Sequence, residues 1–498
     1  MPDGNLYAAL ESAFARHGER TAITTGDGAG LRFTDLAEGA ARYANGLAAL
    51  GVEPGDRVSV QVEKSVANVL LYLAVMKAGA VYQPLNAGYT NSEIEYFVSD
   101  AQPRVIVCDP ARQQAMRALA DRHDVNAVVN LDAAGQGSLA NLASRMSPRH
   151  ETVTRAAGDL AGLLYTSGTT GRSKGAMIAH GNLASNAATL VDLWRITSAD
   201  RLIHALPMFH VHGLYVALNT AILAGAEILW LDKFEVSAVI AALPAATMMM
   251  GVPTFYTRLL SAPALSPEMC RNMRLFISGS APLLSETHAA FIERTGHLII
   301  ERYGMTETGM IASNPYDGAR VAGTVGFALP GVSLRIAGDQ PGVIEVKGPN
   351  VFKGYWRMPE KTTQEFTPDG YFITGDVATM DAEGRVTIVG RAKDLIISGG
   401  FNVYPKEIEG AIDALPNVVE SAVVGVPHPD FGEAVVAAVT ARGPLPSEAS
   451  MIAELARNLA RFKVPKRIFV EPELPRNAMG KVQKAELRMR YAGAFSRT

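Results

Sequence analysis

The sequence predicts an α/β protein with a large N-terminal domain, made of two parallel-type α/β sub-domains and a small β unit, and a small α+β C-terminal domain. Helix and strand patterns alternate from the N-terminus, which is typical of parallel sheets covered by helices. After Gly390 the pattern changes to a compact unit of about a hundred residues. The 498-residue chain is also too long for one ordinary domain. We therefore expect domains at 1–390 and 391–498.

The first sub-domain begins with an amphipathic helix in MPDGNLYAALESAFARHGER. It continues with expected helices at 34–50, 65–78 and 91–101, and with expected strands at 57–62, 81–84 and 104–108. A polar stretch at 133–158 contains Gly and Ser, and it is expected to connect the two sub-domains.

The second sub-domain is expected from a βα series over 202–303. Its most apolar segment, 236–252, is interrupted by Pro244 and splits into a helix-like VSAVIAAL and a strand-like ATMMMGV. Each part is too short to span a bilayer of ~30 Å. The turn-rich strands GVSLRIAG, GVIEVKG and RVTIVGR predict the small β unit. The C-terminal domain is expected to contain strands at DLIIS, ESAVVGV and AVVAAVTA, and helices at 406–414 and 448–459.

Composition and charge narrow the class of protein. The chain is 48% hydrophobic and 19% charged, as in globular enzymes, and its net charge of -3 gives no bias toward nucleic acid or membrane partners. Only Cys108 and Cys270 are present, so we expect neither a disulfide framework nor a cysteine metal site. The N-terminal helix lacks the apolar core of a signal peptide. We expect a cytoplasmic protein.

The segment YTSGTTGRSKG, at 165–175, carries the strongest chemical signal. Its glycines allow tight turns that aim N–H groups at an anion, its hydroxyls add donors, and its lysine supplies countercharge. The spacing differs from GxxxxGK[ST], which excludes the kinase or GTPase loop. A flexible surface loop is the alternative to a triphosphate cradle. The candidate nucleotide-binding residues here are Thr166, Ser167, Gly168, Thr169, Thr170, Gly171 and Lys174.

This segment resembles the signature of the adenylate-forming superfamily, which includes acyl-CoA synthetases, luciferases and nonribosomal adenylation domains. Further segments resemble family motifs in the right order: SGSAPL, ERYGMTET, GYFITGDVA, GRAKDLIISGGFNVYPKEIE and PRNAMGKVQK. The resemblance covers essentially the whole chain. It implies the family's fold, with a C-terminal domain that moves, and it implies ATP, Mg²⁺ and coenzyme A as cofactor and co-substrates.

The resemblance also implies roles for single positions. Thr306 contacts the α-phosphate, Glu307 helps to hold Mg²⁺, Asp376 accepts from the ribose hydroxyls, and Arg391 lies near ribose and phosphate. The residues expected to border the nucleotide's adenine and its surroundings are Gly279, Ser280, Ala281, Glu301, Arg302, Tyr303, Gly304 and Met305.

The C-terminal motifs imply the adenylation machinery. Lys481 is the expected adenylation lysine, which relieves repulsion between two anions as charge builds at the α-phosphorus. Lys393 is the expected hinge, and Gly399 and Gly400 are expected in the CoA channel. This chain departs from the family pattern at Ser173, where proline is usual, and at 477–479, where a Thr/Ser-rich loop is usual. Acylation of Lys481 by a modifying enzyme, as an off switch, is a further hypothesis.

The acid is expected to be a small dicarboxylate. Arg258 lies in GVPTFYTRLL on an expected helix near the substrate, and its planar fork suits a second carboxylate. An ion pair with a protein carboxylate, or exposure to solvent, are the alternatives for Arg258. Several segments resemble malonyl-CoA synthetases, which implies malonate and methylmalonate, with Ser278 beside the substrate carboxylate. His210 and His212 are expected to flank the acid or to shape the pocket, and His210 is a candidate catalytic residue with Lys481, Thr306 and Glu307. Rival functions are another short-chain or aromatic acyl-CoA synthetase, a free-standing adenylation domain that loads a carrier protein, and a luciferase-like oxygenase.

Overall fold

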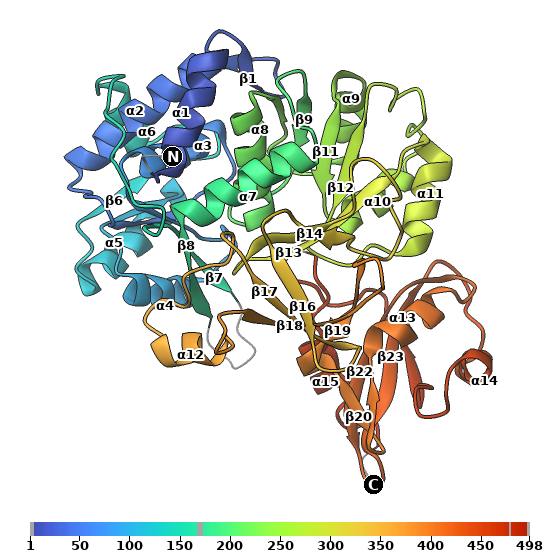
Figure 1. The fold of residues 1–498 in the computed structure, drawn as a ribbon. Coiled ribbons are helices and arrows are strands. Elements are labelled where there is room, and N and C mark those ends of the chain that lie inside the picture. Colours follow the sequence, from blue (N-terminus) through green and yellow to red (C-terminus); the bar gives the residue numbers. More distant parts are fainter. Residues whose placement is uncertain (1–3, 167–172, 478–479, 496–498) are drawn as a thin grey trace. The chain divides into compact units, whose positions relative to one another are not determined.

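A computed structural model describes residues 4–166, 173–477 and 480–495. The chain divides into two compact units. The first contains Met1–Ser333 and Val346–Phe372, and the second contains Leu334–Glu345 and Ile373–Thr498. The α/β class is confirmed, as is the presence of parallel sheets (Figure 1). The boundary at Gly390 and Arg391 and the hinge at Lys393 stay predictions.

The first sheet of the first unit has six strands in the order β6-β5-β3-β4-β7-β8. All neighbours are parallel except β7 and β8, which are antiparallel and bracket 167–172. The strands are rich in β-branched residues, and several are buried on both faces, as expected when helices cover a parallel sheet. They span Arg57–Gln61 (β3), Val81–Pro84 (β4), Val105–Cys108 (β5), Ala127–Asn130 (β6), Leu160–Thr166 (β7) and Lys174–Ala179 (β8).

The second sheet has nine strands in the order β15-β14-β13-β12-β11-β9-β10-β1-β2. Its centre is parallel, and the carboxyl ends of β11 and β12 are aligned because Gly251 pairs with Ser278, while β13 continues four residues beyond Glu301, the partner of Ser278. Sites in such sheets form at these carboxyl ends. The strands span Thr21–Thr24 (β1), Gly30–Arg32 (β2), Arg201–His204 (β9), Glu227–Trp230 (β10), Met248–Gly251 (β11), Leu275–Ser278 (β12), Ile299–Met305 (β13), Gly309–Ser313 (β14) and Phe327–Ala328 (β15).

The helices of the first unit follow the predicted order closely. Four helices were not predicted: α5 (Gln113–Arg122), α7 (His180–Leu193), α12 (Pro359–Gln364) and α6 (Ser138–Ser144). Of these, α6 lies inside the predicted connector, where Leu139 and Ala143 are four residues apart and both buried. A π-helix at His212–Leu218 also lacked a sequence signal. The other helices are α1 (Leu6–His17), α2 (Phe33–Ala49), α3 (Val66–Lys77), α4 (Asn91–Ala101), α8 (Asn219–Ala224), α9 (Val236–Ala242), α10 (Pro253–Leu260) and α11 (Ser285–Thr295).

The second unit is built on two sheets. A four-stranded sheet contains β16 (Ser333–Ala337), β17 (Gly342–Lys347), β18 (Phe372–Met380) and β19 (Val386–Arg391). A five-stranded sheet contains β20 (Ile396–Ser398), β21 (Phe401–Val403), β22 (Val418–His428), β23 (Gly432–Ala441) and β24 (Arg467–Val470). Helices α13 (Pro405–Asp413) and α14 (Glu448–Asn458) bury Ile408, Ile412, Met451 and Leu455 in one core with this sheet, and α15 (Lys484–Tyr491) packs into a second.

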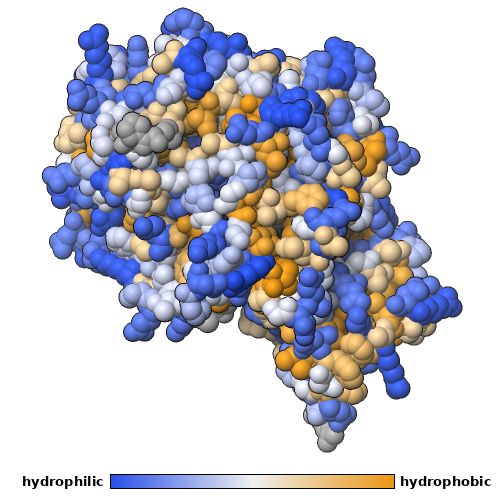
Figure 2. Space-filling model, in the orientation of Figure 1, coloured by the Kyte–Doolittle hydropathy of each residue, from blue (hydrophilic) through white to orange (hydrophobic). Residues whose placement is uncertain are grey.

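The surface view in Figure 2 shows hydrophilic residues spread over most of one face, with hydrophobic residues scattered among them. In the described ranges, no helix is both long enough and apolar enough to cross a membrane.

Candidate active site

The nucleotide loop is anchored by the hairpin of β7 and β8. Thr166 and Lys174 are directly opposite each other where the two strands leave the sheet. Five predicted nucleotide-binding residues, Ser167, Gly168, Thr169, Thr170 and Gly171, lie outside the described residues. The described stem therefore fixes where the loop begins and ends.

Lys174 and Glu307 both contact Tyr355. The buried ammonium of Lys174 lies 4.3 Å from the centroid of the Tyr355 ring and 3.5 Å from Oε1 of Glu365. The Tyr355 hydroxyl donates to Oε1 of Glu307 at 3.1 Å, and the Thr166 hydroxyl donates to the same oxygen at 3.3 Å. The structure thus brings together three predicted residues from β7, β8 and the β13–β14 turn. Tyr355 and Glu365 were missed, because only the fold places 355–365 beside β8.

The Glu307 carboxyl suits a metal that arrives with a nucleotide. It is buried, and burial is the main cause that raises its pKa. No group of three or more metal-ligating side chains occurs in the part of the chain that the structure describes. Mg²⁺ in nucleotide sites uses one or two carboxylates and the substrate's phosphates. Glu307 fits that donor set and would hold the ion. The positive charge of the bound ion would in turn favour the ionised form of the Glu307 carboxyl.

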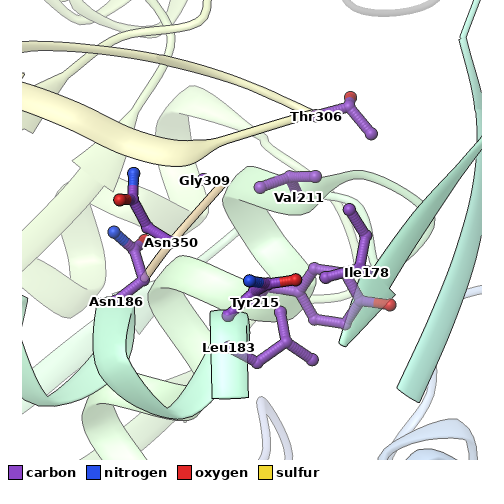
Figure 3. Close-up of a pocket in the computed structure, with 9 residues that line it drawn as sticks. Ile178, Leu183, Asn186, Val211, Tyr215, Thr306, Gly309 and Asn350 are labelled. Atoms are coloured by element: carbon purple, nitrogen blue, oxygen red, sulfur yellow. The ribbon is translucent and has the colours of Figure 1, made fainter. Parts of the chain in front are cut away.

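Thr306 lies in the turn between β13 and β14, at the edge of a small pocket (Figure 3). Asn186 and Asn350 lie next to each other on one side, and Val211 and Tyr215 line the space near Thr306. Both asparagine amides bind the Met310 carbonyl, at 2.9 Å and 3.1 Å. These bonds hold the start of β14, and so they fix the turn that presents Thr306 and Glu307.

A buried arginine lies in the middle of β13, one residue after the partner of Ser278 at the carboxyl end of β12. Arg302 is only 4% exposed, and its Nε and Nη2 have no hydrogen-bond partner among the described residues. Burial lowers its pKa to about 9. Gly279 makes room for it, because a Cβ at this position would lie 2.6 Å from Nε of Arg302. Arg302 is thus a buried cation with unused donors, and its expected place beside the adenine stays a prediction.

Two polar groups accompany Arg302. The Ser278 hydroxyl, at the end of β12, is buried and has no partner among the residues described. Ser280 has a positive φ of 70°, and its hydroxyl lies 3.3 Å from Nδ1 of His212. Burial, followed by the nearby charge of Arg302, lowers the pKa of His212 well below its usual value, so this imidazole is neutral. Ser278 and Ser280 flank Gly279, which lies against Arg302, so hydroxyl groups and one positive charge lie in the same region.

His210 and His212 are set by the start of the π-helix. The His212 N–H donates to Nδ1 of His210 at 3.3 Å. Nε2 of His204, at the end of β9, lies 3.0 Å from the Gly213 carbonyl. Burial lowers the pKa of His204 to about 3, which makes the imidazole neutral and Nε2–H the donor in this bond. His204 was not predicted, because its partner is nine residues away and is brought close only by the fold.

Arg258 is in the last turn of α10, and its side chain is exposed. Tyr256 and Leu259 occupy the buried face of this helix, and the Tyr256 hydroxyl donates to the Ile277 carbonyl at 2.6 Å. Arg258 makes no ion pair or hydrogen bond within the described ranges. The exposed side chain agrees with one of the alternatives left open for Arg258, and its contact with the acid stays a prediction.

Other predicted nucleotide neighbours lie around the same strand ends. Glu301 accepts a bond from the Gly323 N–H at 2.9 Å, which ties β13 to the next loop. Gly304 permits close approach of β14, where a Cβ would meet the side chain of Met310 at 2.6 Å. Ala281, Tyr303 and Met305 are partly exposed near these strand ends. Their contacts with a nucleotide stay predictions.

In the second unit, Asp376 and Arg391 form a cross-strand pair on β18 and β19. Nε of Arg391 lies 3.0 Å from Oδ1 of the buried Asp376. Lys393 follows in a short 3₁₀ turn. Gly399 and Gly400 connect β20 to β21 with φ of 59° and 83°, a two-residue turn that requires glycine-like backbone at both positions.

Lys481 lies beside this pair. Its side chain is exposed, but crowding by protein atoms, followed by the charge of Arg391, lowers its pKa to about 8. The Lys481 N–H donates to Oδ1 of Asn477 at 3.0 Å. Asn477 thus gives its loop a side-chain acceptor, as a Thr or Ser hydroxyl could at this position.

Comparisons with known proteins agree with this geometry. The AMP-binding enzyme family matches residues 10–356, and the AMP-binding enzyme C-terminal domain matches residues 407–481. The crystal structure of ATP-bound MatB from Rhodopseudomonas palustris is 52% identical, with a TM-score of 0.96 over 99% of this chain and 100% of that one. A malonate–CoA ligase of Arabidopsis thaliana is 34% identical over 87% of this chain and 78% of its own length. A feruloyl-CoA synthase of an Amycolatopsis species is also 34% identical, over 95% and 96%. The chain belongs to the AMP-binding enzyme family and has the fold of its adenylate-forming members.

Proposed function

We propose that the protein is an ATP-dependent malonate:CoA ligase that also accepts methylmalonate. In the first half-reaction, a carboxylate oxygen attacks the α-phosphorus of ATP, which gives acyl-adenylate and pyrophosphate. In the second, the CoA sulfur attacks the acyl carbon, AMP leaves, and the thiol proton is released. Relatives named for malonate and a 52% identical structure support this acid.

Buried Arg302 is the observation that carries the dicarboxylate proposal. A buried cation without an anionic partner is costly, and this chain keeps one where two guanidinium nitrogens are unbonded. A monocarboxylate has no anion left once its carboxylate is directed to ATP. A dicarboxylate supplies a second anion, and a guanidinium binds it with paired charge-assisted bonds. The unbonded hydroxyl of Ser278 supplies another donor.

The first half-reaction needs charge neutralisation rather than a general base, because a carboxylate is already nucleophilic. Lys174 and Lys481 would each place an ammonium near phosphate oxygens, and Thr306 a hydroxyl. Mg²⁺, when bound with ATP through Glu307, would supply further countercharge. Asp376 would accept hydrogen bonds from the ribose hydroxyls, next to Arg391.

Coenzyme A is the proposed acceptor, because the compared relatives are CoA ligases and CoA synthases. The alternative functions are a synthetase for another acid, such as ferulate or indoleacetate, and a free-standing adenylation domain that loads a carrier protein. Incubating the enzyme with ATP, malonate and either CoA or a carrier protein separates the last two, because only a ligase forms malonyl-CoA.

The test of the dicarboxylate site compares Arg302→Met with Arg258→Leu. Removing one partner of a buried charge pair costs about 2–5 kcal/mol, so Arg302→Met should lower kcat/KM for malonate by roughly thirtyfold or more. For butyrate, which has no second charge to pair with Arg302, kcat/KM should be no lower in Arg302→Met than in the wild-type enzyme. If Arg302 instead borders the adenine, the KM for ATP should rise in Arg302→Met, and kcat/KM should fall equally for malonate and butyrate. This result would contradict the assignment of Arg302 to the second carboxylate. Loss of malonate activity in Arg258→Leu alone would move the second carboxylate to Arg258.

A further inference from the structure

The segment that carries Lys481 is a short antiparallel ladder. Arg476 and Val482 form a β-bridge, and the Gln483 N–H donates to the Pro475 carbonyl at 2.7 Å. Closer to Lys481, the Asn477 N–H donates to the Lys481 carbonyl at 3.0 Å. Few backbone hydrogen bonds hold this ladder, so its direction depends on what fixes its two sides. We call these sides arms: the first carries Arg476 and the second carries Val482.

Each arm is fixed by an ion pair to the same part of the second unit. On the first arm, Arg476 pairs with Glu420 of β22 and also donates to the Gly480 carbonyl at 2.6 Å. On the second arm, Nζ of Lys484 lies 2.6 Å from Oε1 of Glu409 on α13. Lys481 is five residues after the first anchor and three before the second.

The two acceptors are themselves well held. Glu409 is buried, and its Oε1 accepts a bond from the Val423 N–H at 2.9 Å, so it is fixed to β22. Glu420 is on β22, opposite Thr440 of β23. The side chains of Arg476 and Glu420 are 29% and 30% exposed, so their pair is less screened than one on the open surface. Both anchors therefore lead into a rigid sheet and the helix packed on it.

We propose that Glu420 and Glu409 are positioning residues for adenylation, which act through Arg476 and Lys484 to aim the Lys481 ammonium. This inference rests on the proposed function, because it assumes that Lys481 serves the first half-reaction. The anchors have no role in the attack of CoA on the adenylate. Loosening them therefore slows adenylation, since a displacement of about 1 Å at a reacting group costs up to roughly a hundredfold in rate.

The experiment measures the two half-reactions separately in the full chain. Adenylation is followed as pyrophosphate release, and thioester formation is followed with malonyl-AMP and CoA supplied. Arg476→Met, Glu420→Gln and Lys484→Met should each lower the adenylation kcat by about tenfold or more, while thioester formation stays within about twofold. Arg457→Met is the matched control, because Arg457 pairs with Glu454 on the exposed side of α14 at 2.7 Å and should change neither rate.

A rescue separates positioning from loss of fold. The exchange Arg476→Glu with Glu420→Arg restores an opposite pair, and it should recover much of the adenylation rate with an unchanged Tm. Equal loss of both half-reactions in the single variants would overturn the proposal, as would normal adenylation in all three. Pyrophosphate release by the wild-type enzyme with malonate tests the proposed function independently. Normal adenylation in Lys481→Ala would overturn the anchors' role while leaving the ligase intact.

Discussion

Replacing Gly279 with alanine places a methyl group against the guanidinium of Arg302. The added Cβ would lie 2.4 Å from Cζ of Arg302 and 2.6 Å from its Nε and Nη1, where ordinary contact begins at 3.4 Å. The guanidinium would therefore have to move by about 1.0 Å, the difference between 3.4 Å and the shortest of these distances. Arg302 is buried in a packed strand end, so the displacement cannot be absorbed by solvent.

That displacement sets the expected effect on the acid. A charged hydrogen bond near 2.8 Å stretched by about 1.0 Å passes beyond bonding range. Net contributions of such bonds are about 1.5–3 kcal/mol, which corresponds to a roughly ten- to hundredfold lower kcat/KM for malonate. The kcat/KM for butyrate should fall much less, because butyrate presents no second charge to Arg302.

The assay is initial-rate pyrophosphate release at saturating ATP, with malonate and butyrate titrated separately. Gly26→Ala is the control, because a Cβ at Gly26 meets nothing within 4 Å and its φ needs no glycine. An unchanged kcat/KM for malonate in Gly279→Ala would refute the contact between Arg302 and the acid. An equal fall for both acids would refute it too, and would instead indicate damage to the nucleotide site.

Three further predictions concern the second unit. Lys481→Ala should abolish adenylation but leave thioester formation from supplied malonyl-AMP, and equal loss of both would remove Lys481 from its role. Lys481 has a pKa of about 8 and is charged below it, so adenylation should fall as pH rises past 8, whereas Lys481→Arg, which stays charged, should lack that fall. Burial raises the pKa of Asp413 to about 7, above its unfolded value of 3.8, so stability should decline as pH rises from 4 to 7, by at most roughly 4 kcal/mol. Asp413→Asn should flatten this pH dependence, measured as the free energy of urea unfolding at pH 5 and pH 8. An unchanged pH dependence in the variant would disprove the raised pKa of Asp413.

The elements that sequence predicted well are those with strong local patterns. The Val236–Ala242 helix and the Met248–Gly251 strand were predicted from apolar runs separated by Pro244. Helix α6 was missed because its seven residues are mostly small or polar, and its two buried residues matter only against neighbours. Short helices draw most of their stability from such packing.

The site was predicted by motif, but its contacts were not. Motif resemblance named Asp376 and Arg391 separately, while their pairing across β18 and β19 follows from strand register. The helix that carries Arg258 was predicted correctly, but which face of it Arg258 occupies was not: the structure places Arg258 on the exposed face, and its contact with the acid stays a prediction. The burial of Arg302 depends on Gly279, which directly follows β12 and is distant in sequence, so no local pattern reports it.

The most direct test of the proposed function is the acid specificity of the wild-type enzyme. Pyrophosphate release and CoA thioester formation should be measured with malonate, methylmalonate, acetate, butyrate and a longer fatty acid. The dicarboxylate site predicts the highest kcat/KM with malonate, followed by methylmalonate, with malonyl-CoA as the product. A higher kcat/KM with acetate or butyrate would contradict a site built around the second carboxylate.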